Sequence, residues 1–292
     1  MTSRPGASAR WMLVAILGCA TAPNREPEQA ALRPPLVESI VHESTVTVAP
    51  VDPSALVGGL AGAGLGAIAW ERQRKEANEG LLSLRTVTAD FDFEARYALP
   101  LARAIKDVSW LRAAEVVRSR EPSTHGGAAG RNVLRVDTRH TLSPDLTVLE
   151  VRSVVDFFPA RRTETSPERI VIKYRSEPIG DVAEEVALTL WSYAKGEAYR
   201  RVVTEGIDES LKMFRMCLDS MAGTNRAGPE AELWVSLSWG TPGVGRSLNA
   251  VKLEGTIVEE TTTRLVLQSG GAFYSLPKSA VSGREPRRDD PP

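Results

Sequence analysis

The strongest constraint on the fold lies between residues 132 and 173, where hydrophobic and polar residues alternate in two consecutive runs. The first run ends at Ser143–Asp145, a sequence typical of a turn, and the second is followed by a polar loop and the hydrophobic stretch Arg169–Tyr174. Alternation places every second side chain on one face of a strand. The alternating residues are Leu134, Val136, Thr138, His140, Leu142, Leu149, Val151, Val155 and Phe157. We therefore expect three strands in an antiparallel meander.

Helical spacing dominates residues 182–221, where hydrophobic residues recur about every four positions. This pattern predicts one long amphipathic helix, and Gly196 and Gly206 mark positions where it can bend. A shorter helix is expected after Pro100, whereas Leu81–Phe93 alternates in part and is interpreted as a strand.

Short hydrophobic runs separated by turn residues fill the C-terminal part of the chain. We expect strands at Ala231–Trp239, Ala250–Val258, Arg264–Gln268 and Ala272–Leu276. This order of strands resembles small SH3-like or Sm-like β-barrels in pattern only and implies no ligand. One further strand is expected at Leu36–Ala49 and another at Ala113–Arg118.

A short apolar run, Trp11–Leu17, follows Arg4 and Arg10 near the start of the chain. This order is typical of a secretory signal. The run is too short to cross a bilayer, which takes about 20 apolar residues. Gly18 is small, as a cleavage position requires, and Cys19 comes directly after it.

The segment Ile16–Cys19 resembles the lipobox of bacterial lipoproteins, although Leu17 is larger than the residue usual at its position. The resemblance implies that Cys19 is acylated and anchors the mature chain in the lipid bilayer. Ala20 is similar to the outer-membrane sorting pattern of Gram-negative lipoproteins, which implies a periplasm-facing protein of the outer membrane. The alternative is an ordinary chain start with a chance cysteine.

Residues 53–70 carry no charge, and Gly58, Gly62 and Gly66 stand four residues apart within them. On a helix these glycines form a stripe without side chains, which lets another helix approach closely. The segment resembles the glycine-zipper stretches of bacterial envelope proteins, which implies a membrane-inserted or self-associating helix. The alternatives are a glycine-rich loop and a helix buried in the soluble fold.

The expected fold class is α+β: an antiparallel meander sheet with packed helices, a glycine-rich N-terminal helix and a small C-terminal β module. The expected segments are a signal peptide (1–18), a lipidated tether (19–35), a strand plus the glycine-rich apolar helix (36–80), an α+β domain (81–228), the C-terminal β module (229–282) and a disordered tail (283–292).

The net charge gives no argument for nucleic acid or for an anionic membrane as a partner. The whole chain has a formal net charge of −1, and removal of residues 1–18 deletes Arg4 and Arg10, which leaves −3. A nucleic-acid-binding chain is usually strongly basic. The chain has two cysteines, so acylation of Cys19 leaves Cys217 without a partner for an internal disulfide.

Motifs for catalysis or cofactor binding are weak. Gly240–Ser247 nearly matches a nucleotide-binding P-loop, but Arg246 replaces its lysine and a strand is expected next instead of a helix. His42, His125 and His140 lack metal-ligand spacing. We therefore expect no cofactor, no metal and no catalytic residues.

The sequence thus favours a non-enzymatic outer-membrane lipoprotein that acts as a scaffold or binding component of the cell envelope. Its expected partners are the lipid bilayer, through acylated Cys19, and either an envelope protein or a second copy of the chain. The alternative is an envelope hydrolase or a small-ligand-binding lipoprotein whose site is not recognisable in the sequence.

Overall fold

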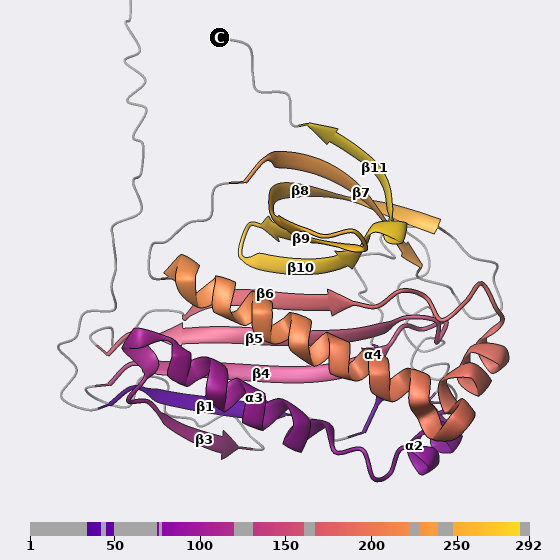
Figure 1. Cartoon of the computed structure of the whole chain (residues 1–292), viewed down its shortest axis with the longest axis horizontal. Helices are drawn as coiled ribbons and strands as arrows, with labels where there is room; N and C mark the ends of the chain where they lie inside the picture. The colour runs from indigo at the N-terminus through magenta and orange to yellow at the C-terminus, as the bar shows by residue number, and fades with distance from the viewer. Residues whose placement is uncertain are drawn as a thin grey trace, which may run out of the picture.

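The structure, a computed structural model, describes residues 34–41, 45–49, 75, 78–119, 131–160, 167–221, 228–238 and 248–286. A mixed sheet of 11 strands is its frame (Figure 1). The strand order is β11-β7-β8-β9-β10-β6-β5-β4-β1-β3, and β2 pairs with β4 beside this path. The strands are β1 (Leu36–Val41), β2 (Thr47–Val48), β3 (Glu115–Ser119), β4 (Val133–Leu142), β5 (Leu149–Phe158), β6 (Glu168–Arg175), β7 (Glu230–Ser238), β8 (Leu248–Glu260), β9 (Arg264–Ser269), β10 (Ala272–Pro277) and β11 (Val281–Pro286).

Strands β4, β5 and β6 confirm the three-stranded meander predicted from alternation. β4 and β5 pair in antiparallel register from Val133 with Phe158 to Leu142 with Leu149, and β5 pairs with β6 in the same sense. The alternating hydrophobic residues are buried on the face that packs against the helices. The central ones are Leu134, Val136, Val151, Val155 and Ile172, none more than 1% exposed.

The predicted fold class is wrong, because the sheet is mixed and extends well beyond an antiparallel meander. β1 pairs in parallel with both β3 and β4, β2 pairs in parallel with β4, and β10 pairs in parallel with β6. The single strand predicted at Leu36–Ala49 is divided into β1 and β2. Parallel pairing joins strands that are distant in the sequence, so the alternation within each strand does not reveal it.

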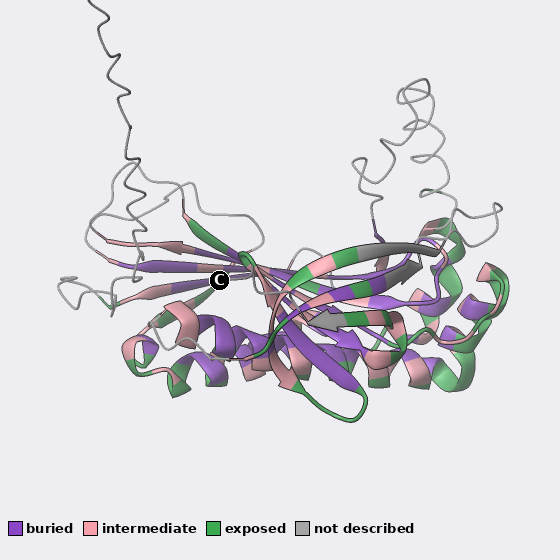
Figure 2. Ribbon diagram, turned by 90° about the horizontal axis from the view of Figure 1, so that it is seen from above, coloured by how far each residue is buried: buried purple, intermediate pink, exposed green. Residues whose placement is uncertain are grey.

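The helices α2 (Leu82–Val87), α3 (Phe93–Asp107) and α4 (Glu184–Met221) lie on one side of the sheet (Figure 2). The strand predicted at Leu81–Phe93 is therefore wrong. Asp92 caps α3, because its carboxylate accepts a hydrogen bond from the backbone nitrogen of Ala95 at 3.0 Å. The partial alternation before it belongs to α2 and to the turn between the two helices.

Helix α4 bends where Gly196 was expected to allow it. Ala194, Lys195 and Gly196 have φ values of 48°, 60° and 74°, so two helical segments meet at this point. A Cβ on Gly196 would lie 2.6 Å from Cγ2 of Thr88. The other candidate, Gly206, instead lets α4 approach the sheet closely.

Strands β7 to β11 enclose a second, smaller core. Its buried members are Ala231, Leu233, Val235, Ile257, Leu265, Leu267 and Leu276. The strands predicted here are confirmed as β7 to β10, but β10 also pairs with β6, so the sheet runs on from the meander. Strand β11 spans Val281–Pro286, so the tail predicted to be disordered from residue 283 begins inside a strand. The other predicted domain boundaries stay predictions.

Candidate functional site

The residues that carried the functional prediction lie outside the described part of the chain. This holds for Cys19, for the stripe Gly58, Gly62 and Gly66, and for the loop Gly240–Ser247. Acylation and close helix contact therefore stay predictions.

His140, on β4, is a core residue. Its Nε2 lies 2.9 Å from the hydroxyl oxygen of Tyr199 on α4, and its ring stacks on Phe93 with centroids 4.1 Å apart. Nδ1 has no hydrogen-bond partner within the described ranges. Burial lowers the pKa of His140 to about 3, so the imidazole is neutral at physiological pH. A neutral, buried imidazole held by a tyrosine serves packing.

Cys217 is also part of the core between α4 and the sheet. It is fully buried, and burial raises the pKa of its thiol. A reactive cysteine needs a lowered pKa and access to solvent. Cys217 has neither, because it is buried and the pKa of its thiol is raised. Among the described residues, no group of three His, Cys, Asp or Glu side chains is arranged to hold a metal ion.

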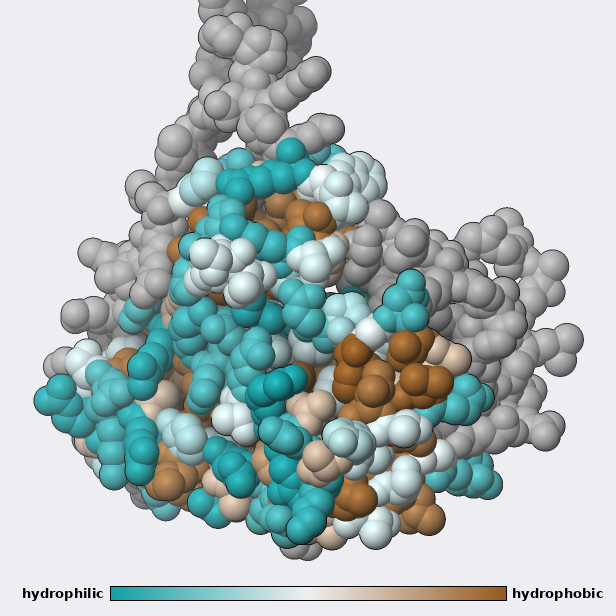
Figure 3. Space-filling view, turned by 45° about the vertical axis from the view of Figure 1, so that its right-hand side comes forward, coloured by the Kyte–Doolittle hydropathy of each residue, from teal (hydrophilic) through white to brown (hydrophobic). Residues whose placement is uncertain are grey.

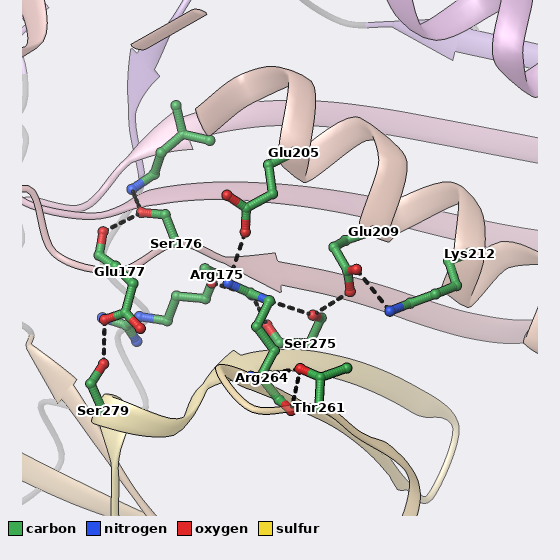
Figure 4. Close-up of polar contacts among 11 residues, drawn as sticks. Arg175, Ser176, Glu177, Glu205, Glu209, Lys212, Thr261, Arg264, Ser275 and Ser279 are labelled. Atoms are coloured by element: carbon green, nitrogen blue, oxygen red, sulfur yellow. Dashed lines mark hydrogen bonds and ion pairs between the residues drawn. The ribbon is translucent and has the colours of Figure 1, made fainter. Parts of the chain in front are cut away.

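A dense polar cluster surrounds Arg264, the first residue of β9 (Figure 4). Its Nη2 donates to the backbone carbonyl oxygens of Arg175 at 2.6 Å and Ser275 at 3.0 Å, and its Nε donates to Oγ of Ser275 at 3.1 Å. The guanidinium carbon lies 4.4 Å from the ring centroid of Tyr174. Arg264 is only 8% exposed, so nearly all of its donors are used inside the protein.

Helix α4 supplies the acidic half of this cluster. Nη1 of Arg264 donates to Oε1 of Glu205 at 3.2 Å, and Oγ of Ser275 donates to Oε2 of Glu209 at 2.9 Å. Lys212 then donates to Oε1 of Glu209 at 2.7 Å and to Glu259 of β8 at 2.9 Å. Both α4 carboxylates thus have internal cationic or hydroxyl partners.

This Arg264 cluster joins the C-terminal strands to α4, which is a structural role. A general acid or base must be able to reach a substrate proton, whereas Glu209 is held between Ser275 and Lys212. No motif in the sequence predicts this cluster. The only signal was a charged stripe at Glu205, Glu209 and Lys212, three and four residues apart on one face of a predicted helix.

An exposed apolar patch lies where α2 meets the N-terminal half of α4. Figure 3 shows hydrophobic side chains gathered on this end of the molecule. We define the apolar end as Leu82 on α2 together with Val186, Leu190 and Tyr193 on α4. Their exposed fractions are 68%, 47%, 38% and 76%. Val186 and Leu190 are one turn apart on one face of α4, and Tyr193 follows at the bend, where the backbone leaves the helical conformation.

Comparison of the chain with protein-family models, curated proteins and solved structures gave no match. No helix in the described ranges has the length and apolar character needed to cross a bilayer.

Proposed function

We propose that the protein is a non-enzymatic lipoprotein, anchored through acylated Cys19 in the outer membrane and facing the periplasm, that binds or scaffolds another envelope component. The anchor is inferred from the order of residues from Arg4 to Cys19. The binding role is inferred from the described surface and core.

The observation that carries the binding role is the apolar end. Large hydrophobic side chains that cluster on a surface are typical of protein interaction sites. Tyr193, with 76% of its surface exposed, is of a residue type enriched at the centre of interfaces. A partner protein or a second copy of the chain that covers these four side chains would remove their apolar surface from water.

The buried groups support a non-enzymatic role. His140 is neutral and packed, Cys217 is inaccessible, and the carboxylates beside Arg264 serve as internal ion-pair partners. Each of these groups has an internal packing, hydrogen-bond or ion-pair partner.

The test is chemical cross-linking of the full chain in its membrane, with the double variant Leu82→Ser and Tyr193→Ser. We expect the variant to lose the cross-linked species formed by the parent protein. Leu99→Ser is the matched control, because Leu99 is 55% exposed on α3 and does not belong to the apolar end. Equal cross-linking in all three proteins would refute the binding role of this patch.

The anchor is tested in the same preparation with Cys19→Ser. This variant should leave the membrane pellet, because the acyl chains supply the hydrophobic transfer that holds the protein. Its retention in the pellet at the parent level would contradict the lipoprotein assignment.

A further inference from the structure

The sheet face opposite the helices carries a row of positive side chains. Val151 and Tyr174 point toward Gly206 of α4, so their sequence neighbours Arg152 and Lys173 point to the other side. Arg139 is next to His140, whose ring meets α4 and α3, and therefore lies on that other side too.

Strand register brings these cations directly opposite one another. Arg139 of β4 pairs with Arg152 of β5, Arg152 pairs with Lys173 of β6, and Lys173 pairs with Tyr274 of β10. Adjacent strands are about 4.8 Å apart, so the row crosses the sheet with one charge per strand. We call Arg139, Arg152 and Lys173 the cationic row.

Neighbouring rows on the same face contain acidic side chains, and the adjacent row carries Asp137, which lies two residues before Arg139 on β4. Three further acidic side chains on this face have basic partners: Glu38 with Arg135 (2.9 Å), Asp156 with Arg169 (2.7 Å) and Glu150 with Arg175 (3.9 Å). In contrast, no ion pair or side-chain hydrogen bond joins Arg139 or Arg152 to another described residue. Lys173 places its Nζ 5.4 Å from the ring centroid of Tyr274.

Like charges directly opposite on paired strands destabilise a sheet. The cost falls when an anion lies against the row. Side chains on a strand stand roughly perpendicular to the sheet, so the charged groups of the row point outward in parallel and do not converge on one point. This arrangement fits a surface that carries many anionic groups better than it fits a single small anion.

We propose that the cationic row docks the sheet face on an anionic phospholipid surface. The proposal rests on the lipid anchor proposed above. Cys19 and Pro34, the first described residue, are 15 positions apart, which limits the domain to about 50 Å from the anchor even for a fully extended chain. Within that distance the membrane surface is the anionic partner present at the highest local concentration.

The anchor also makes a weak contact effective. Each basic residue near an anionic bilayer contributes little by itself, so a few cations would not hold a free protein on a membrane. Tethering converts docking into an intramolecular step with a high effective concentration. The row would therefore orient an anchored domain, with the sheet face toward the lipid and the helices and apolar end toward a partner.

The experiment uses the full acylated chain, reconstituted in vesicles of neutral lipid or of neutral lipid with about 30% phosphatidylglycerol. A fluorophore attached at Val154→Cys reports the sheet face, and one at Leu99→Cys reports α3. Cys217 does not compete for the label because it is buried. Quenching by spin-labelled lipids measures how close each fluorophore lies to the bilayer.

We expect strong quenching at position 154 in anionic vesicles only, and weak quenching at position 99 in both. Arg139→Gln with Arg152→Gln should weaken docking at least about tenfold, because two surface-facing charges are lost. The matched control is Arg103→Gln with Lys106→Gln, which removes the same charge from exposed positions on α3 and should change nothing.

Equal quenching of the two double variants, or equal quenching in neutral vesicles, would overturn the proposal. Loss of the signal on addition of inorganic phosphate at constant ionic strength would indicate a small-anion site and also overturn it. A protein that fails to sediment with neutral vesicles has no working lipid anchor. That result would refute both the proposed function and this inference. Sedimentation without row-dependent quenching removes the inference alone.

Discussion

Replacement of Arg264 by methionine should destabilise the protein by about 3–5 kcal/mol. Methionine keeps an unbranched apolar stem but removes every donor, which leaves the carbonyl oxygens of Arg175 and Ser275 without the hydrogen bonds of 2.6 and 3.0 Å. A buried polar group that loses its partner costs about 1–3 kcal/mol. Two such groups, together with the lost contact to Glu205 at 3.2 Å, give the expected range.

Urea unfolding of the full chain, followed by circular dichroism, measures this loss as a lower midpoint at unchanged slope. The control is Arg284→Met, because Arg284 pairs with Glu260 at 2.9 Å and both side chains are more than one-third exposed. An exposed pair contributes at most about 1 kcal/mol. If Arg264→Met cost no more than Arg284→Met, the Arg264 cluster would not hold the C-terminal strands on α4.

Two further predictions test the core. Gly206→Ala should destabilise by about 1–2 kcal/mol despite the better helix propensity of alanine, because its Cβ would lie 2.8 Å from Val151 and 2.9 Å from Tyr174. Gly80→Ala, whose nearest neighbour would be 4.0 Å away, should be neutral or stabilising in the same thermal melt. The pKa of His140 is about 3 in the folded protein against a usual 6.5. Its contribution to the free energy of unfolding is therefore fully present above pH 6.5. Stability should then fall as pH drops from 6.5 toward 3, by up to about 1.4 kcal/mol per pH unit. His140→Gln should flatten this slope in urea titrations at stepped pH, and an unchanged slope would assign it to other groups.

Sequence reasoning found the elements whose patterns are local. Alternation around Leu134 and Val151 located β4 and β5, and Gly196 marked the bend of α4. The strand prediction at Leu81–Phe93 failed because its alternating residues also fit the end of one helix and the start of the next. These residues are Val87, Ala89, Phe91 and Phe93. Here Asp92, a capping residue type, was the better signal.

Pairing between distant strands had no local signal. Nothing within Leu36–Val41 specifies that it lies in parallel beside both β3 and β4, and the same holds for β10 beside β6. The Arg264 cluster depends on that second pairing, because Arg175 and Ser275 meet only when β6 and β10 are neighbours. The sequence therefore contains the residues of the cluster but does not predict that they lie close together.

The same reasoning applies to charge. The formal net charge of −1 gives no argument for an anionic partner when the charges are spread evenly, but the sheet spreads them unevenly. Alternation assigns Arg139, Arg152 and Lys173 to the outer side of their strands, but only register decides what stands opposite each of them. A shift of β5 by two residues would place Val154 or Glu150 opposite Arg139 and interrupt the row. In the observed register Val151 lies opposite His140 on the core face and Arg152 lies opposite Arg139 on the other face. Any shift of β5 would therefore change the core contacts on one face and the charge pairs on the other together.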